Sequence, residues 1–134
     1  MRNRGGAVTL SSRPDETLRS RSAAEVFEDH LRLRMAGDLE TDLRRNYADE
    51  VVLLTVNSCF IGHDGMRRSA KKLADQLPDA KFEFIAKKVE QRFALVIWRA
   101  ESSRFEAVEG SDSFVIEDGL IRLQTIHYGL RPSS

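Results

Sequence analysis

Residues 105–130 decide the fold, and they read FEAVEGSDSFVIEDGLIRLQTIHYGL. Apolar and polar residues alternate on both sides of Asp118-Gly119, a dipeptide that favours a tight turn between antiparallel strands. This pattern predicts a hairpin with strands over about Phe105–Ile116 and Leu120–Leu130. Two earlier segments, Lys81–Glu90 and Phe93–Ser102, alternate in the same way and are joined by short junctions, so a meander of four strands is expected.

The N-terminal half of the chain has helix signals instead. Ser22 and Glu25 have capping-box spacing and Gly37 closes the pattern, which predicts a helix over Ala23–Ala36. The apolar arc of this helix contains His30, so we expect this histidine to point inward. A second, shorter helix is expected after Asp38, with Leu39, Leu43 and Tyr47 on one face.

The middle of the chain joins these helices to the meander. β-Branched residues and leucines predict a buried strand over Val51–Val56, and the segment Asn57–His63 reads as a loop. Asp64 and Pro78 are expected to begin and end a third helix. Its basic residues are interpreted as a solvated face, with a phosphate site as the alternative: Arg67, Arg68, Lys71 and Lys72. Helices followed by a meander indicate an α+β domain with its helices on one face of a sheet.

Composition narrows the class of function. The chain has 134 residues, the length of one typical domain, and 21 basic residues balance 21 acidic ones. No net field is available to hold a polyanion, so no nucleic-acid partner is expected. A lone cysteine, Cys59, and three scattered histidines offer no disulfide and no zinc-site spacing, so neither a metal nor an organic cofactor is predicted.

The ends and hydropathy of the chain give further expectations. No apolar run approaches the roughly 20 residues that span a bilayer, and no secretory signal is visible. A cytoplasmic protein without a membrane partner is therefore predicted. Residues 1–19 are rich in Arg, Ser and Gly and are interpreted as a disordered tail, with a basic docking arm as the alternative. One domain is expected over residues 20–131.

A family resemblance follows from the order of these segments. The run YADEVV at 47–52, the run GHDG at 62–65 and the closing DGLI at 118–121 occur in the order and spacing of one superfamily. Over about residues 22–130 the chain resembles the nuclear-transport-factor-2-like superfamily, in particular its SnoaL-like polyketide-cyclase branch. The resemblance implies a cone, in which a strongly curved mixed or antiparallel sheet wraps the N-terminal helices and encloses a pocket. It also implies a homodimer through the outer sheet face. Members include isomerases, cyclases, hydrolases and binding modules, so the resemblance does not name a reaction.

The register of the last hairpin determines which side chains face the pocket. A two-residue turn would pair Ile116 with Ile121 and place Thr125 and His127 beside Asp112. We favour a three-residue loop with Gly119 as a left-handed bulge, which suits the resemblance and pairs Ile116 with Leu120. In that register Gln124, Ile126 and Tyr128 share the face of Asp112, together with Val108, Gly110 and Phe114. His127 then lies outside with an apolar stripe of Ile121, Leu123 and Thr125, where we predict the dimer interface.

Asp112 is the leading candidate for a catalytic residue. An inward aspartate between Gly110 and Phe114 must be paired, hydrated or neutral, because burial penalises its charged form. We interpret it as an acid or base whose raised pKa lets it give a proton or hydrogen bond to a substrate oxygen. The resemblance supports this interpretation, since Asp112 matches the strand aspartate of the ketosteroid isomerases. The alternative is a structural aspartate that bonds a backbone amide or Gln124, or lies in water at the rim.

His30 is the second catalytic candidate. It matches the helix position of the oxyanion tyrosine in the ketosteroid isomerases and could polarise a carbonyl group or shuttle a proton. A buried histidine bonded to a neighbour is the alternative. The remaining positions are expected to bind the ligand as walls of the pocket, or at its mouth in the case of His63: Phe27, Tyr47, His63, Trp98, Phe114, Gln124, Ile126 and Tyr128.

The chain departs from the known enzymes that it resembles. The general base of the isomerases belongs near Thr55, and threonine cannot take up a proton at neutral pH. The limonene epoxide hydrolases need an Asp-Arg-Asp set, but Ile126 replaces the last aspartate, and Leu53 and Thr55 replace the residues that hold their water. The inward Asp112 in an aromatic-lined cavity points to a cofactor-independent isomerase- or cyclase-type enzyme for a small hydrophobic carbonyl compound. The missing base and the missing Asp-Arg-Asp set point to the alternative, a noncatalytic ligand-binding or dimerisation module.

Overall fold

The computed structural model describes residues 12–134, and residues 1–11 lie outside the described part of the chain. Helix α1 spans Ser12–Arg19. The predicted disordered tail covered residues 1–19, so it is wrong for its last eight residues, and its first eleven lie outside the described residues. Tertiary contacts with a distant turn, set out below, hold the end of α1 and could not be seen in the local sequence.

Three further helices follow the sequence signals closely. Helix α2 spans Ala23–Ala36, with both hydrogen bonds of the capping box formed and Gly37 in the left-handed conformation at its end. Helix α3 spans Leu39–Asn46 and is capped by Asp38, as predicted. Helix α4 spans Gly62–Gln76. The prediction that Asp64 caps α4 is wrong: the helix begins three residues earlier without a side-chain cap, and Asp64 pairs with Arg67.

Six strands form one mixed sheet. Their bounds are β1 Tyr47–Leu54, β2 Cys59–Ile61, β3 Lys81–Glu90, β4 Phe93–Glu101, β5 Phe105–Glu117 and β6 Leu120–Pro132, in the spatial order β2-β1-β6-β5-β4-β3. Strands β1 and β6 run parallel and all other neighbours run antiparallel. Strand β2 lies inside the segment that we predicted to be a loop, and β1 begins at Tyr47 rather than Val51.

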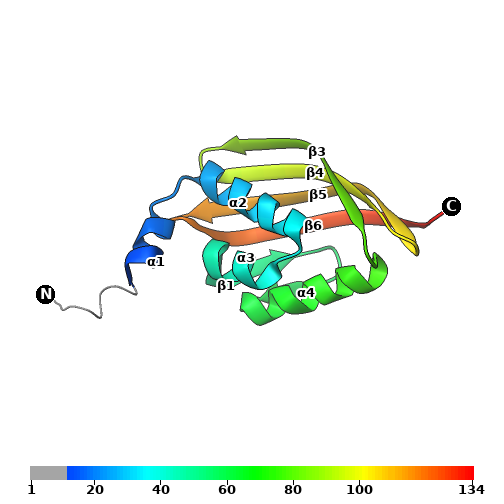
Figure 1. The fold of residues 1–134 in the computed structure, drawn as a ribbon, viewed down its shortest axis with the longest axis horizontal. Coiled ribbons are helices and arrows are strands. Elements are labelled where there is room, and N and C mark those ends of the chain that lie inside the picture. Colours follow the sequence, from blue (N-terminus) through cyan, green and yellow to red (C-terminus); the bar gives the residue numbers. More distant parts are fainter. Residues whose placement is uncertain (1–11) are drawn as a thin grey trace, which may run out of the picture.

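Helices cover one side of this open sheet. Figure 1 shows α2 and α3 lying across the sheet, with α4 along the side formed by β1 and β2. The buried core lies between these layers and includes Phe27, Leu43, Val51, Leu53 and Ile121. The architecture is thus α+β, with N-terminal helices packed against a sheet, as the sequence predicts.

The turn between β5 and β6 differs from the predicted one, although the side chains beyond it face the same way as in the favoured register. Asp118 and Gly119 form a two-residue turn, both with positive φ (54° and 73°), and Ile116 pairs with Ile121. At the next pair away from the turn, Val115 lies opposite Leu123, so β6 carries an extra, unpaired residue at Arg122.

The bulge at Arg122 exchanges the two faces of β6 beyond it. Asp112 therefore pairs with Ile126 and Phe114 with Gln124, so Gln124 and Ile126 share the face of Asp112, as we predicted. The predicted pairing of Ile116 with Leu120 is wrong. Ile121 lies before the bulge and is fully buried, so its predicted place on the outer face is also wrong. His127 is exposed on the outer side, in keeping with the favoured register.

A second irregularity lies in β5 near Glu109, which has a φ of 54°. Between Ala107 and Ser111 this strand has one residue more than either neighbour. As a result Ala107 and Gly110 are both buried, and Val108, which simple alternation placed inward, lies on the opposite side. The bulge brings the backbone at Gly110 under the ring of Trp98, so closely that a methyl group added there would lie 2.5 Å from the indole.

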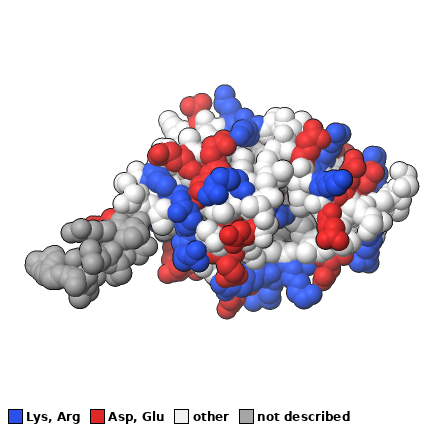
Figure 2. Space-filling model, viewed as in Figure 1, with Lys and Arg blue, Asp and Glu red and all other residues white. Residues whose placement is uncertain are grey.

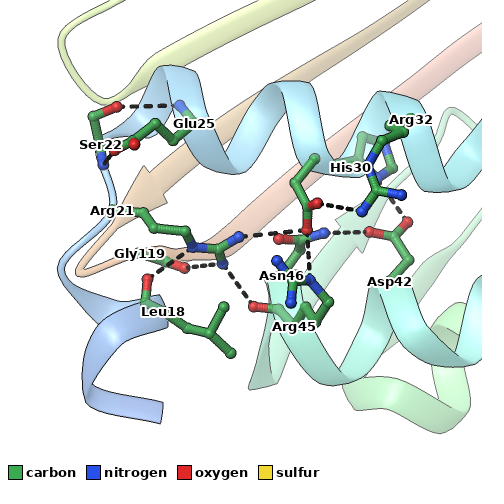
Figure 3. Close-up of polar contacts among 11 residues, drawn as sticks. Leu18, Arg21, Ser22, Glu25, His30, Arg32, Asp42, Arg45, Asn46 and Gly119 are labelled. Atoms are coloured by element: carbon green, nitrogen blue, oxygen red, sulfur yellow. Dashed lines mark hydrogen bonds and ion pairs between the residues drawn. The ribbon is translucent and has the colours of Figure 1, made fainter. Parts of the chain in front are cut away.

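Arg21 ties the end of α1 to the rest of the fold (Figure 3). Its guanidinium donates hydrogen bonds to three backbone carbonyls: Leu18 at 2.9 Å, Arg45 at 2.8 Å and Gly119 at 3.1 Å. These acceptors belong to α1, to the end of α3 and to the β5–β6 turn. A single side chain therefore joins three segments that lie far apart in the sequence.

Asp29 is the acidic partner of this cluster. Its carboxylate lies 3.4 Å from Arg21 and accepts a hydrogen bond of 2.8 Å from Arg45. Burial alone would raise the pKa of Asp29, but hydrogen bonds from Arg45 and other neighbours outweigh burial and hold this pKa well below its usual range. The cluster stays charged and fastens α2 to α3.

Charges of both signs are interspersed over the surface in Figure 2, and basic side chains gather along the lower edge, where α4 lies. Two of the four basic residues of α4 have acidic partners: Arg67 binds Glu40 and Asp64, and Lys71 binds Asp75. The predicted solvated face of α4 fits these exposed ion pairs. No helix among the described residues is long and apolar enough to cross a membrane.

Candidate functional site

A cavity of about 260 Å³ lies between the helices and the inner face of the sheet. Helices α2, α3 and α4 supply one wall, and strands β1 and β3 to β6 supply the other. Its lining is mostly apolar and aromatic, with a small number of polar groups, which is the usual make-up of a site for small organic molecules. Those polar groups include both predicted catalytic residues, Asp112 and His30.

Asp112 lies in the middle of β5 and is held by two donors. The indole Nε1 of Trp98 donates to its Oδ1 over 2.9 Å, and the amide Nε2 of Gln124 donates to its Oδ2 over 3.0 Å. Burial raises the pKa of the Asp112 carboxyl, and this effect outweighs the two hydrogen bonds, which act in the opposite direction. The carboxyl group of Asp112 is therefore hydrogen-bonded within the protein, which was one of the alternatives open from the sequence, and it also borders the cavity.

Tyr47 fixes the orientation of Gln124. Its hydroxyl donates to Oε1 of Gln124 over 2.5 Å, which leaves the amide nitrogen to face Asp112. Burial raises the pKa of Tyr47 well above its ordinary value, so the hydroxyl remains protonated and remains a donor. The result is a continuous chain of hydrogen bonds from Tyr47 through Gln124 to Asp112.

His30 belongs to a buried pair that the sequence analysis missed. Its Nδ1 lies 2.7 Å from Oδ2 of Asp42, and both side chains are about 5% exposed. Asn46 donates to the other oxygen of Asp42 over 2.9 Å, and Figure 3 shows this row of three side chains between α2 and α3. Because Asp42 occupies Nδ1, the second ring nitrogen, Nε2, is the one left for a ligand.

The signal for Asp42 was present in the sequence. Leu39, Asp42, Leu43 and Asn46 recur with helical spacing on the side of α3 that faces the core. Two polar residues on an apolar face require partners inside the protein. An inward histidine on the preceding helix was the available partner.

Aromatic rings surround the polar groups. His30 packs edge-on against Phe114, with ring centroids 5.2 Å apart, and Phe114 packs against Phe27 at 5.4 Å. Trp98 lies between Phe82 and Tyr128, at 5.6 and 5.5 Å. These contacts keep the imidazole and the indole in fixed orientations.

The predicted ligand-binding positions fall into two groups. Tyr47, Trp98, Gln124 and Ile126 line the cavity together with Asp112 and His30. The other four lie outside its lining. Phe27 and Phe114 are core residues that pack behind His30, and the His63 ring forms a hydrogen bond of 3.0 Å with the backbone carbonyl of Tyr47. Tyr128 borders a neighbouring hollow, and its hydroxyl donates a hydrogen bond to the side chain of Gln76.

Thr55 and Arg99 lie outside the lining of this cavity. Thr55 follows β1 and borders a neighbouring hollow, and its hydroxyl is bonded to that of Ser58 at 2.7 Å. Arg99 is exposed and pairs with Glu83 at 2.7 Å. Within the described part of the chain, no group of three His, Cys, Asp or Glu side chains could hold a metal ion.

Comparison with known proteins was made at three levels. No family model matches the sequence, and no curated protein matches it. Solved structures do match. A nuclear-transport-factor-2-like protein of unknown function from Burkholderia xenovorans LB400 superposes with a TM-score of 0.68 at 12% identity, covering 92% of this chain and 90% of that one.

Two further matches come from the SnoaL-like group. A proposed SnoaL-like polyketide cyclase from Mesorhizobium loti gives a TM-score of 0.62 at 12% identity, over 81% of this chain and all of that one. A proposed isomerase of the SnoaL-like family from Agrobacterium tumefaciens gives 0.62 at 14% identity, over 78% and 98%. The resemblance inferred from the sequence is confirmed at the level of the fold: this chain has the nuclear-transport-factor-2-like fold in the form seen in SnoaL-like proteins.

Proposed function

We propose that the cavity binds a small, largely apolar carbonyl compound and that the protein is a cofactor-independent enzyme of the isomerase or cyclase type. The observation that carries this proposal is that a carboxyl group with a raised pKa and a histidine held by an aspartate both border one cavity. The SnoaL-like neighbours, described as a cyclase and an isomerase, support the same reaction class.

The two groups have complementary roles in this proposal. Asp112, as a neutral carboxylic acid, donates a proton or a hydrogen bond to the carbonyl oxygen of the substrate. Nε2 of His30 accepts a proton from the carbon next to that carbonyl, while Asp42 holds Nδ1 and stabilises the imidazolium that forms. Proton removal at carbon and proton donation at oxygen give an enol, which can be reprotonated or can attack a second carbonyl.

The hydrogen-bond chain supports these roles. Tyr47 and Gln124 connect the surroundings of His30 to Asp112, since the Tyr47 hydroxyl lies 3.5 Å from Nδ1 of His30 and 2.5 Å from Gln124. All these side chains come from helices or strands and not from loops. A site built on such elements keeps its geometry, which proton transfer requires.

A noncatalytic ligand-binding module is the second candidate. It is favoured by a specific observation, namely that both oxygens of Asp112 already accept hydrogen bonds from the protein. The site also has no base at Thr55. In this case Asp112 would organise the pocket wall without exchanging a proton with the ligand.

Dimerisation is proposed with either function. The outer face of the sheet carries two rows of side chains across β1, β6, β5 and β4: Leu54, Thr125, Ser113 and Leu95 in one row, and Val52, Leu123, Val115 and Phe93 in the next. Leu54, Leu95 and Phe93 are at least 40% exposed. Apolar side chains grouped on an exposed sheet face favour contact with a second copy of the chain.

The test begins with the freshly purified protein. Native mass spectrometry is expected to show a co-purified small molecule and a dimer in the same spectrum. Turnover of that compound, or of its close carbonyl analogues, is then compared among the wild type, Asp112→Asn and His30→Gln, with Asp75→Asn on α4 as an exposed control. We expect a loss of about 100-fold or more for the first two variants and none for the control. Unchanged turnover in Asp112→Asn would exclude Asp112 as the acid.

A further inference from the structure

Among the described residues, Arg34 is the one lysine or arginine that lines the cavity, and neither role proposed above uses it. Its guanidinium carbon lies 4.4 Å from the centroid of the Phe82 ring. The aromatic face holds the planar group by a cation–π contact, but it satisfies none of the five N–H donors. Among the side chains that the structure describes, those of residues 16–134, the guanidinium of Arg34 has no ion-pair or hydrogen-bond partner.

The position of Arg34 places a positive charge close to the polar groups. Arg34 follows His30 by four residues on α2, so the two side chains lie on the same face of that helix. Phe82, beneath the guanidinium, packs against Trp98, which in turn donates to Asp112. The charge of Arg34 also acts on Asp112, where it lowers the pKa slightly against the larger effect of burial.

The carboxylates around the cavity are all engaged with other groups. Asp38 accepts from the backbone of Thr41 at 3.2 Å as the cap of α3. Asp42 accepts from His30 and Asn46, and Asp112 accepts from Trp98 and Gln124. Because none of them pairs with Arg34, the guanidinium remains a charged donor that faces the cavity.

We infer that Arg34 binds the carboxylate of an amphiphilic organic acid whose apolar body fills the cavity. A guanidinium binds a carboxylate with two parallel hydrogen bonds and releases little water on doing so, which suits it to this task. Phe82, Phe84, Met66 and Leu73 supply apolar walls for the body of the acid. The cavity is slightly smaller than the roughly 300–1,000 Å³ of sites for drug-sized molecules, so one or two rings are the expected size.

This inference rests on the proposed function, because it names the class of molecule that the same cavity takes. It adds a requirement that the proposed function lacks: the ligand must carry a negative charge at one end. The acid and the matching neutral amide have nearly the same shape, so a comparison of the two isolates the charge.

The experiment uses benzoic, phenylacetic, cinnamic and 2-naphthoic acids and their four primary amides as probes. Dissociation constants are measured by ligand-observed NMR for the wild type, Arg34→Met, Arg34→Lys and Arg32→Met. Arg32 lies on the exposed side of the same helix and pairs with Asp29, so it is the matched control. Thermal unfolding of each variant establishes that it is folded.

We expect the wild type to bind at least one acid about tenfold or more tightly than its amide. Loss of a charged hydrogen-bonding group typically weakens binding by about ten- to a hundredfold. Arg34→Met should therefore weaken the binding of that acid by this factor and leave the affinity for the amide unchanged. Arg34→Lys should restore part of the affinity, because it keeps the charge without the paired donors. Arg32→Met should bind as the wild type does.

Two results would overturn the inference in different ways. If acids and amides bind equally well and Arg34→Met changes neither, the assignment of Arg34 fails while binding in the cavity stands. If none of the eight compounds binds the wild type, the inference fails together with the ligand class of the proposed function.

Discussion

Trp98 and Asp112 lie on neighbouring strands, and the indole Nε1 of Trp98 donates a hydrogen bond of 2.9 Å to the carboxyl group of Asp112. The ring can reach this position because the residue opposite Trp98 in the sheet is Gly110. A methyl group at position 110 would lie 2.5 Å from two ring carbons of the indole. The chemistry of the cavity thus depends on a glycine that does not line it.

Gly110→Ala should therefore destabilise the protein. Overpacking of this kind costs about 1–3 kcal/mol, and the displaced indole would lose its hydrogen bond to Asp112. Urea unfolding measures the first effect, and the NMR shift of the indole N–H reports the second. Gly129→Ala is the control, since its added methyl group would be 3.5 Å from the nearest atom, an ordinary contact. Equal stability of the two variants would contradict the prediction.

The raised pKa of Asp112 predicts a pH-dependent contribution to stability. The folded protein favours the neutral carboxyl more than the unfolded chain does, where the pKa is 3.8. This contribution is fully present below pH 3.8 and is lost as the pH rises through the raised pKa of the folded state. In urea unfolding between about pH 3 and 7, the stability of the wild type relative to Asp112→Asn should fall as the pH rises.

Asp38 offers a control of opposite sign. Hydrogen bonds from Thr41 lower the pKa of this capping carboxylate below 3.8. Its contribution is present above that pH and is lost as the pH falls through the lowered pKa. The stability of the wild type relative to Asp38→Asn should therefore rise with pH over the acidic part of the same range. The prediction for Asp112 fails if both comparisons show the same trend.

The pair of His30 and Asp42 predicts a defined tautomer of the imidazole. With the carboxylate accepting from Nδ1, the proton of the neutral ring lies on Nδ1, and Nε2 carries the lone pair. Asp42→Asn should shift the balance toward the Nε2–H form, because an amide can donate to Nδ1. It should also destabilise the fold by about 2 kcal/mol, since a buried hydrogen bond to a charged group is lost.

Nitrogen-15 NMR of the imidazole distinguishes the two tautomers directly, and urea unfolding measures the loss in the free energy of unfolding. Asp64→Asn is the comparison for stability. Because Asp64 makes an exposed ion pair, its replacement should lower the stability less than Asp42→Asn does. An unchanged tautomer in Asp42→Asn would show that the aspartate does not orient the ring.

The three backbone contacts of Arg21 predict that one substitution releases helix α1. Arg21→Gln shortens the side chain and removes most of its donors to Leu18, Arg45 and Gly119. Amides of α1 should then exchange with solvent about tenfold faster or more, because Arg21 carries hydrogen bonds that join the end of this helix to α3 and to the β5–β6 turn. Arg19→Gln is the matched control, because Arg19 is exposed in the last turn of the same helix. Equal exchange in both variants would show that other contacts hold α1.

Local signals predicted most of the fold. The capping box at Ser22 and Glu25 gave the bounds of α2, and alternation gave β3 to β6 to within two residues. Strand β2 was missed because it has only three residues and is stabilised by pairing with β1, a contact that the local sequence does not contain. Helix α1 was missed for a similar reason, since Arg21 holds it through partners up to 98 residues away.

The candidate site was predictable in part. Alternation brought Asp112, Gln124 and Ile126 to one face, and helical spacing turned His30 inward. Which atoms meet was not predictable, because the bulges at Glu109 and Arg122 depend on the packing of three strands against each other. The partner of His30 could have been found from the two polar residues on the apolar face of α3, but only by comparing two helices at once.

The extra residue at Arg122 has a consequence for how such proteins diverge. If Arg122 instead took a regular place opposite Val115, the tight turn would stay the same but the rest of β6 would shift by one residue along β5. Thr125 and His127 would then enter the cavity in place of Gln124 and Ile126. A bulge gained or lost beside a turn can therefore exchange one set of functional groups for another while the scaffold stays the same, which gives this fold a short evolutionary route between chemistries.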